Sequence, residues 1–400
     1  MKTKINKAPR ASSKSKAMTV LSRITQTAVI IAAALVLVAC ATAPLPLPPP
    51  PAGSVEPARP DTGAGQAGVR LQGKSRWVPV SWAELPGFEG DALFEAWNAW
   101  IKSCERPGPV FAPLCGEVRR LSIATNDEQR AWMVSRLQPY RVETPQGVAD
   151  GLLTSYYEPV LKASRQPGNS YAVPLYQPPA GLASRKPWYT RQEIDTLPEA
   201  QAALRGREIA WLADPIDAMS LHIQGSGRLE ITEANGVKRT VRVAFAGSNE
   251  QPFRSITQWL SEQGQGRMSP PWTESTKVWA AQNPQRVPQL LWSNPRYIFF
   301  REEALSEQDA AYGPRGAQGV ALTPGRSIAV DKESIPYGTP VWLASRGAAV
   351  DLQKLVIAQD TGSAIVGAVR ADYFAGTGPE AGQLASRVSQ PLRLWALWPK

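Results

Sequence analysis

Residues 358–374 read Ala358-Gln359-Asp360-Thr361-Gly362-Ser363-Ala364-Ile365-Val366-Gly367 and then, two residues later, Arg370-Ala371-Asp372-Tyr373-Phe374. Two aspartates therefore lie twelve residues apart around a glycine-bearing turn. A third, Asp331, follows the apolar run Ile328-Ala329-Val330. We predict that three strands end at these aspartates and bring them to one cleft. Carboxylates without a set of metal ligands favour general acid–base chemistry on an uncharged bond.

The beginning of the chain has the composition of a signal peptide. Its first 39 residues hold seven Lys or Arg and no acidic residue, and residues 28–39 form an unbroken apolar run of twelve. This run is shorter than an ordinary membrane-spanning helix. The segment Leu37-Val38-Ala39-Cys40 resembles a bacterial lipobox, which implies cleavage before Cys40 and lipidation of that cysteine. An uncleaved single-helix anchor is the alternative, and Met18 is an alternative start.

These features also predict a location and change the charge argument. Ala41 follows Cys40, where an aspartate would indicate retention at the inner membrane, so we expect an outer-membrane lipoprotein facing the periplasm of a Gram-negative bacterium. Without residues 1–39 the net charge is about +3 rather than +10, so the high pI is no evidence for nucleic-acid binding. Eight prolines between Pro44 and Pro60 predict a stiff tether, which we assign to residues 40–74.

The cysteines and the single histidine limit other chemistries. An oxidising periplasm favours a disulfide between Cys104 and Cys115, with two buried free thiols as the alternative. We expect no zinc site, because His222 is the only histidine and no further cysteine pair exists. His222 lies between Leu221 and Ile223, which is more typical of a structural histidine than of a Ser-His-Asp triad.

From about Trp77 onward the chain has the texture of a globular protein with room for two domains. Apolar residues at three- and four-residue steps predict helices at residues 93–101 and 127–137, whose aromatic stripes we assign to the core. After Gly147, short apolar runs predict strands at residues 152–157, 171–176, 220–224 and 239–244, with helices at 256–260 and 274–281. Buried strands are predicted at residues 328–330, 341–343 and 355–358.

Five separated segments together resemble one known family. In chain order they are Thr154-Ser155-Tyr156-Tyr157-Glu158-Pro159, then Asp217-Ala218-Met219 with Ile223-Gln224-Gly225-Ser226-Gly227, then Asn294-Pro295-Arg296-Tyr297-Ile298-Phe299-Phe300, then Asp331 with Ile335-Pro336-Tyr337-Gly338-Thr339, and finally Asp360-Thr361-Gly362 through Asp372. Over roughly residues 75–400 this order resembles the membrane-bound lytic murein transglycosylase A family. The C-terminal part also resembles the broader three-aspartate domain.

The resemblance implies a mainly β fold with some α: a double-psi β-barrel that carries an inserted second β-rich domain. Residues 75–159 would form a helical segment and the first part of the barrel, residues 160–302 the inserted domain, and residues 303–400 the rest of the barrel. Glycan is expected to bind in the groove between them. The positions that match this groove are Thr154, Tyr156, Gln224, Gly225 and Ser226. Ser155 and Ser363 stand where family members often carry glycine.

The implied reaction is non-hydrolytic cleavage of the MurNAc–GlcNAc β-1,4 bond of peptidoglycan, which leaves a 1,6-anhydro-MurNAc end. By position, Asp372 corresponds to the catalytic acid, which afterwards acts as the base. Asp360 would orient groups in the cleft and raise the pKa of the acid, and Asp331 would be a more structural third member. No cofactor or metal is implied. The expected partners are glycan strands, the outer membrane through Cys40, and cell-wall synthesis or hydrolysis complexes, with the protein itself a monomer.

Two other classes of protein compete with this interpretation. Asp360-Thr361-Gly362-Ser363 matches an aspartic-protease loop, but the only other Asp-Thr-Gly copy, at residues 61–63, lies in the tether, so such a protease would have to be a dimer. A non-catalytic peptidoglycan-binding lipoprotein could use the same groove. Retention of all three aspartates argues against it.

Overall fold

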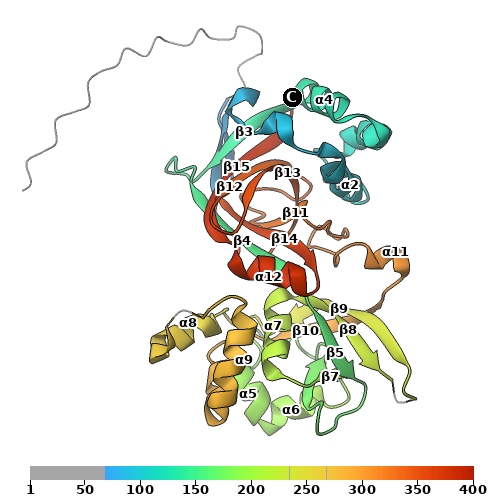
Figure 1. Cartoon of the computed structure of the whole chain (residues 1–400), viewed down its shortest axis with the longest axis vertical. Coiled ribbons are helices and arrows are strands. Elements are labelled where there is room, and N and C mark those ends of the chain that lie inside the picture. Colours follow the sequence, from blue (N-terminus) through green and yellow to red (C-terminus); the bar gives the residue numbers. More distant parts are fainter. Residues whose placement is uncertain (1–67, 234, 267) are drawn as a thin grey trace, which may run out of the picture. The chain divides into compact units, whose positions relative to one another are not determined.

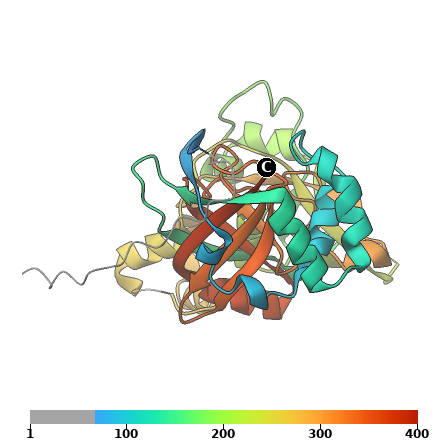
Figure 2. The ribbon, with the colours of Figure 1, turned by 90° about the horizontal axis from the view of Figure 1, so that it is seen from above.

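The strands fall into two sheets in the computed structural model, which describes residues 68–233, 235–266 and 268–400 (Figure 1). The first sheet has the order β1-β2-β3-β15-β12-β13-β11-β14-β4, and β15 also pairs with β4. The strands from β15 round to β4 therefore close into a six-membered barrel, which Figure 2 shows from above. The sheet consists of β1 (Arg70–Gln72), β2 (Ser75–Pro79), β3 (Leu137–Glu143), β4 (Gly151–Glu158), β11 (Ser327–Val330), β12 (Pro340–Arg346), β13 (Asp351–Asp360), β14 (Arg370–Thr377) and β15 (Ser389–Pro399).

Strand β13 is apolar on both faces, because each face meets a different core. Successive side chains of a strand point to opposite sides. Val356 and Ala358 pack in one cluster with the apolar residues of β11, β14 and β15, whereas Leu355 and Ile357 pack in a second cluster with Trp97. The second cluster fills the space between the barrel and its helices.

The helices beside the barrel follow from the sequence periodicity. They are α2 (Leu93–Ser103), α3 (Cys115–Arg120), α4 (Asn126–Arg136) and α12 (Pro379–Arg387), with short 3₁₀ turns at Trp82–Glu84, Phe88–Gly90, Ala112–Leu114 and Leu121–Ile123. The predicted helices at 93–101 and 127–137 are confirmed, and Trp97 and Trp100 are buried as expected, although Phe94 is exposed. A capping box between Thr125 and Glu128 fixes the start of α4. Helix α12 packs on β4 and β14.

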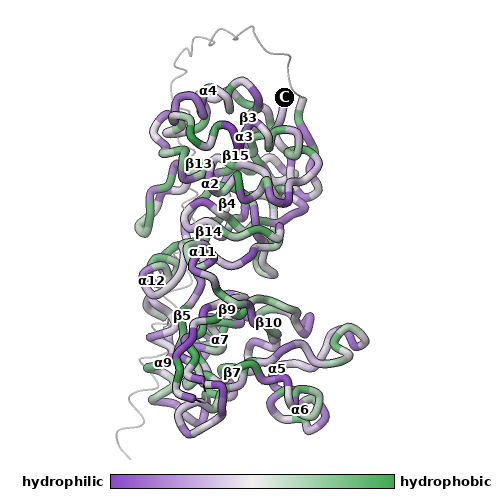
Figure 3. The backbone as a smooth tube through the Cα atoms, turned by 90° about the vertical axis from the view of Figure 1, so that its right-hand side faces the viewer, coloured by the Kyte–Doolittle hydropathy of each residue, from purple (hydrophilic) through white to green (hydrophobic). Residues whose placement is uncertain are grey.

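The second sheet has the order β10-β9-β8-β5-β7-β6. Its strands are β5 (Val160–Ser164), β6 (Val173–Tyr176), β7 (Glu208–Leu212), β8 (Ser226–Thr232), β9 (Lys238–Ser248) and β10 (Ile298–Ala304). Figure 3, coloured by hydropathy, shows hydrophobic stretches along β7 and β9. The helices of this part are α5 (Arg191–Thr196), α6 (Pro198–Leu204), α7 (Pro215–Gln224), α8 (Ile256–Leu260), α9 (Trp272–Gln282), α10 (Val287–Trp292) and α11 (Glu307–Ala310), with a π-turn at Ser261–Gln265 and a 3₁₀ turn at Pro284–Arg286.

One predicted strand is wrong. Residues 220–224 belong to helix α7 and not to a strand. The Asp214 side chain accepts a hydrogen bond from the Ile216 N–H, Pro215 occupies the first helical position, and Gly225 ends the helix with φ at +80°. These are ordinary start and stop signals of a helix. Residues 220–224 by themselves alternate polar and apolar side chains, which is typical of a strand, and the helical pattern shows only when Ile216 and Met219 are included.

A buried ion cluster joins the two sheets. Glu158, the last residue of β4, is fully buried; its carboxylate accepts hydrogen bonds from Arg242 at 2.6 Å and from Arg228 at 2.8 Å. The two arginines belong to β9 and β8 of the second sheet, and they also donate to the Tyr312 carbonyl. The cluster therefore fixes the barrel strand that carries Thr154 against the second sheet.

The predicted fold class is confirmed: a barrel-shaped sheet carries a second β-rich part, with helices beside both. The described residues belong to one compact unit, Gln66–Lys400. No helix among them combines the length and apolar character needed to cross a bilayer. The predicted signal peptide, the lipidated Cys40, most of the tether and the second Asp-Thr-Gly copy lie outside the described residues.

Candidate active site

Strand pairing brings Asp360 and Asp372 to the same region of the barrel. Ala329 of β11 is the register partner of Asp360 on one side and of Asp372 on the other. Asp360 ends β13 as predicted, but Asp372 is the third residue of β14, so a strand begins there instead of ending. Because β14 runs antiparallel to β11, its beginning lies beside the end of that strand, and the two carboxylates still converge.

Thr154 and Tyr156 of β4 each hold one of these carboxylates. Strand β4 runs parallel to β14 with Thr154 opposite Asp372 and Tyr156 opposite Phe374. The Thr154 hydroxyl donates to Asp372 Oδ1 at 2.5 Å, and the Tyr156 hydroxyl donates to Asp360 Oδ2 at 2.8 Å. Residues two apart in a strand share a face, which explains why this spacing serves both aspartates.

The environment of Asp372 keeps its carboxyl group neutral at mildly acidic pH. Burial raises the pKa of Asp372 to about 6, against the Thr154 hydrogen bond and the Arg370 charge, which lower it; the Asp360 charge raises it further. The sequence suggested two sources of this shift, an apolar setting from Tyr373 and Phe374 and the negative charge of Asp360. Burial is the larger cause.

Arg370 sets the direction of the hydrogen bonds at Asp372. Its Nη2 donates to Thr154 Oγ1 at 2.7 Å, and a guanidinium can only donate. The single hydroxyl hydrogen of Thr154 is therefore free to point at Asp372 Oδ1. A proton on the neutral acid then belongs on Oδ2, the oxygen that Thr154 does not occupy. The sequence gives no sign of this role, because Thr154 lies 216 residues away from Arg370.

Asp360 is held by the loop that follows α11. Its Oδ1 accepts hydrogen bonds from the backbone N–H groups of Ala317 and Thr361, both at 2.9 Å. Burial raises the pKa of Asp360, against the hydrogen bonds from Tyr156, Thr361 and Ala317. With three donors fixed by the protein, this carboxylate is an organising group for the loop and for Tyr156.

Asp331 follows the last residue of β11 and caps a turn. It accepts hydrogen bonds from the Gly367 N–H at 2.9 Å, the Glu333 N–H at 3.0 Å and Lys74 Nζ at 3.2 Å. Burial opposes ionisation, but these bonds outweigh it and lower the pKa of Asp331. A more structural role for Asp331 stays a prediction from the family resemblance.

Two cavities meet at this site. A cavity of about 1110 Å³, here the Asp372 cavity, is lined by Thr154 and Asp372, and one of about 560 Å³, the Asp360 cavity, by Tyr156, Gly225, Ser226 and Asp360. Ile223 and Gln224 line both. The structure thus gathers every predicted groove residue, from β4 and from the end of α7. The Gln224 side chain also accepts a hydrogen bond from the Tyr157 N–H at 3.0 Å, which ties α7 to β4.

The charge of the Asp360 cavity was not apparent from the sequence. Four arginines line it, from three segments of the chain: Arg106, then Arg296 and Arg301, then Arg315. Only the folded chain brings them together. Ser363, one of the two positions where the family often has glycine, lines the same cavity. Ser155, the other position, lines the Asp372 cavity, and its hydroxyl donates to the Tyr373 carbonyl at 2.7 Å.

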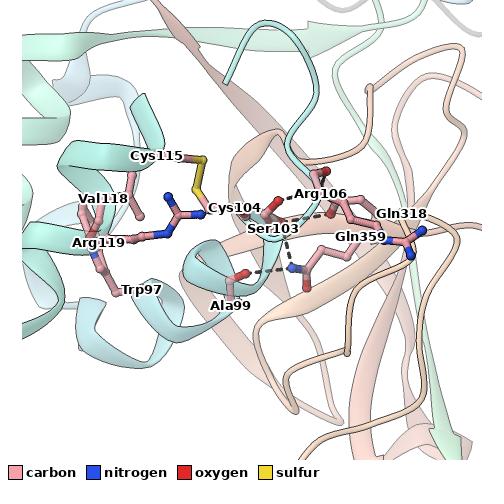
Figure 4. Close-up of a disulfide and its surroundings, with 10 residues drawn as sticks. All are labelled: Trp97, Ala99, Ser103, Cys104, Arg106, Cys115, Val118, Arg119, Gln318 and Gln359. Atoms are coloured by element: carbon pink, nitrogen blue, oxygen red, sulfur yellow. Dashed lines mark hydrogen bonds between the residues drawn. A yellow bond between two sulfur atoms is a disulfide. The ribbon is translucent and has the colours of Figure 1, made fainter. Parts of the chain in front are cut away.

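A disulfide holds the segment after α2, and Ser103 at the end of that helix contacts Gln359 and Gln318 (Figure 4). Cys104 and Cys115 are bonded, and Arg119 donates to the Cys104 carbonyl at 2.6 Å. At the end of α2, the Ser103 hydroxyl accepts from Gln359 at 2.8 Å and donates to Gln318 at 3.0 Å. These two glutamines are the sequence neighbours of Asp360 and Ala317, so the disulfide-bonded segment supports the loop that holds Asp360.

In the described part of the chain, no three His, Cys, Asp or Glu side chains are grouped to hold a metal ion.

Comparison with known proteins places the chain in a family. The model of the MltA specific insert domain matches residues 152–301, and the model of the 3D domain matches residues 326–398. The structure of the lytic transglycosylase LtgG of Burkholderia pseudomallei shares 40% identity, with 81% of this chain and 95% of that chain covered and a TM-score of 0.56. This chain belongs to the membrane-bound lytic murein transglycosylase A family.

Further members of this family agree with that assignment. MltA from Neisseria gonorrhoeae is 27% identical over 83% of this chain and 93% of that chain, with a TM-score of 0.66. The membrane-bound lytic murein transglycosylase A of Vibrio cholerae serotype O1 is 30% identical over 256 residues, 62% of this chain and 65% of that protein. The chain therefore matches just under two thirds of this curated relative. The two family models cover both β4 with its Thr154 and Tyr156 and all three aspartates.

Proposed function

We propose that this protein is a peptidoglycan lytic transglycosylase that cleaves the MurNAc–GlcNAc β-1,4 bond without water and leaves a 1,6-anhydro-MurNAc end. The observation that carries the proposal is Asp372: a carboxyl group on the wall of a large cavity, with a pKa near 6 and one oxygen occupied by Thr154. Membership of the MltA family gives the substrate class. Ordinary glycosidases need a second carboxyl group as nucleophile or base, whereas here the sugar supplies its own nucleophile.

In the first half of the reaction, Asp372 is the acid. Its Oδ2 proton passes to the glycosidic oxygen as the bond from that oxygen to C1 of MurNAc breaks. Thr154 keeps its hydrogen bond to Oδ1 and stabilises the carboxylate that forms, and the charge of Arg370 does the same. A pKa near 6 suits a group that must lose and regain a proton in one turnover.

In the second half, Asp372 is the base. The C6 hydroxyl of the same MurNAc attacks C1, and its proton returns to the Asp372 carboxylate. The new C6–O–C1 bond closes the anhydro ring, and the enzyme is again protonated. Because nucleophile and electrophile belong to one bound sugar, little entropy is lost in bringing them together.

The Asp360 cavity is suited to an acidic ligand. Its four arginines would face a bound glycan strand, and the peptide stems of that glycan carry carboxylates. Asp360 and Tyr156 position the wall of this cavity, and Gln224 links it to the Asp372 cavity. We assign Thr154, Tyr156, Gln224, Gly225 and Ser226 to glycan binding on this basis.

The location is part of the same proposal. A lipid on Cys40 and the proline-rich tether would hold the enzyme at the outer membrane and let it reach the wall from the periplasmic side. The bonded Cys104 and Cys115 agree with an oxidising compartment. In this setting the partners are glycan strands and wall-synthesis or hydrolysis complexes, with the enzyme acting as a monomer.

Mass spectrometry of soluble products from purified sacculi tests the reaction. We expect anhydro-muropeptides from the wild-type protein and none from Asp372→Asn. The matched control is Asp351→Asn on β13, an exposed aspartate that pairs only with exposed Arg346 and should leave the products unchanged. Reducing-end muropeptides would instead indicate a hydrolase with Asp360 as a second carboxylate. Sacculus binding without release would indicate a binding lipoprotein.

A further inference from the structure

A third cavity lies in the second-sheet part of the protein, and neither Asp360 nor Asp372 lines it. Its volume is about 450 Å³, within the range of sites for small molecules. We call it the Arg191 cavity. Tyr176, Arg191, Asp195, Glu208, His222 and Tyr297 are among the residues that line it.

Arg191 is a buried cation without a carboxylate partner in the described part of the chain. Only 6% of the residue is exposed. Its Nε donates to the Asn294 carbonyl at 3.1 Å, and its Nη2 donates to the Arg296 carbonyl at 2.7 Å and to His222 Nδ1 at 3.0 Å. Its Nη1 has no hydrogen-bond partner among the described residues. Buried charges are almost always paired, so this guanidinium has hydrogen-bond donors free to bind an anion.

His222 and two tyrosines add further donors. Because Arg191 can only donate, His222 Nδ1 accepts, and the neutral ring then carries its hydrogen on Nε2. Burial, followed by the Arg191 charge, lowers the pKa of His222 well below its ordinary value, which keeps the ring neutral. Within the described residues, neither Nε2 nor the hydroxyls of Tyr176 and Tyr297 have a hydrogen-bond partner.

Acidic side chains lie at the accessible side of the cavity. Asp195 is exposed and Glu208 is half-buried, and neither forms an ion pair with a described residue. They outnumber the one exposed cation there, Arg205. The cavity is thus rich in donors at its buried end and in carboxylates toward solvent.

We propose that the Arg191 cavity binds a small zwitterion, an amino acid or a short peptide, with its carboxylate against Arg191 and its ammonium toward Asp195 and Glu208. The free Nη1 can donate its N–H groups to this carboxylate, and a hydrogen bond between two charged groups is stronger than one between neutral groups. The site does not depend on the reaction proposed above, because none of its donors contacts Asp372. His222 also lines the Asp360 cavity, so the two sites share one wall.

The single histidine of the chain makes the test specific. In untagged full-length protein, the imidazole resonances in an NMR spectrum belong to His222 alone. We expect alanylalanine to shift them saturably, and its C-terminal amide and N-acetyl derivative to bind at least about tenfold more weakly, since each lacks one charge. The D,D and L,L forms distinguish a wall-derived peptide from an ordinary one. Equal binding of the amide, or no shift up to the solubility limit, would overturn the proposal.

A variant confirms that the peptide occupies this cavity and not the one on the other side of His222. Tyr176 lines only the Arg191 cavity, and Tyr176→Phe removes one hydroxyl without disturbing the carbonyls that Arg191 holds. We expect it to weaken the peptide titration several-fold, and the matched control Tyr189→Phe, outside the cavity, to leave it unchanged. An unchanged titration in Tyr176→Phe would assign the resonance shift to the Asp360 cavity and contradict the proposal.

Discussion

Asp372 determines the expected pH dependence of the reaction. Its pKa is raised to about 6, so the neutral form that can donate a proton predominates below that pH and is lost above it. We therefore expect kcat/KM for sacculus digestion to fall about tenfold per pH unit above pH ~6. Initial rates of soluble muropeptide release over a pH series measure this. A rate that stayed constant to about pH 8 would show that Asp372 is not the acid.

Substituting Arg370 should change the pH above which kcat/KM falls, which is the alkaline limb of the pH profile. The charged and polar groups that face Asp372 are Arg370, Thr154, Asp360 and Tyr156. Of these, Arg370 is the only cation and favours the carboxylate, so Arg370→Met raises the pKa of Asp372 further. We expect the alkaline limb of kcat/KM to move to higher pH. The control is Arg393→Met, an exposed arginine paired with Asp150, for which the limb should stay in place. A shift to lower pH in Arg370→Met would contradict the role assigned here.

At the scale of elements, the disulfide should contribute measurably to stability. It closes a short loop of 11 residues in sequence separation, between the end of α2 and the start of α3. Restricting the unfolded chain in this way is worth about 3 kcal/mol in the chain-entropy model. We expect the double variant Cys104→Ser, Cys115→Ser to lose about that much free energy of unfolding in a denaturant titration. Dithiothreitol should lower the free energy of unfolding of the wild type by a similar amount and leave that of the double variant unchanged.

Helices and strands were predictable where the sequence has a long or regular pattern of apolar residues. Helices α2 and α4 carry eleven residues each with clear periodicity, and the strands around the aspartates are continuous apolar runs. Helix α7 was misassigned because its last residues, 220–224, alternate polar and apolar side chains as a strand does. Its capping residues, Asp214 and Pro215, were the available signal, and they should have outweighed this short alternation.

Hydrogen bonds between side chains that are distant in the sequence could not be predicted from it. The sequence and the family resemblance predicted that Asp360 and Asp372 converge, although Asp372 lies near the beginning of its strand. Sequence spacing could not show that Thr154 accepts from Arg370 while donating to Asp372, because these contacts join β4 to β14. The same holds for Glu158 and its two arginines, which lie 70 and 84 residues further along.

At the scale of the whole molecule, Glu158 couples the barrel to the second sheet. Glu158→Gln removes the charge between two arginines that are themselves largely buried. Breaking a buried ion pair in this way costs about 3–5 kcal/mol. We expect that loss in the free energy of unfolding, measured in urea. The control, Glu303→Gln, breaks a partly exposed pair with Arg301 and should cost less than about 1 kcal/mol. Equal effects would mean that the cluster does not couple the two parts.

The barrel can close only after its last strand in sequence, β15, has been synthesised. Strand β15 pairs with β3, β4 and β12, and its Ser389 is the register partner of Thr154. The ribosome makes β15 after every other strand of the barrel, so Thr154 gains its second neighbouring strand only when synthesis of the described chain is nearly complete. Such long-range pairings form late in folding. The wall-cutting activity proposed above therefore requires the residues of β15 to be synthesised and paired, because only then does Thr154 have both of its neighbouring strands.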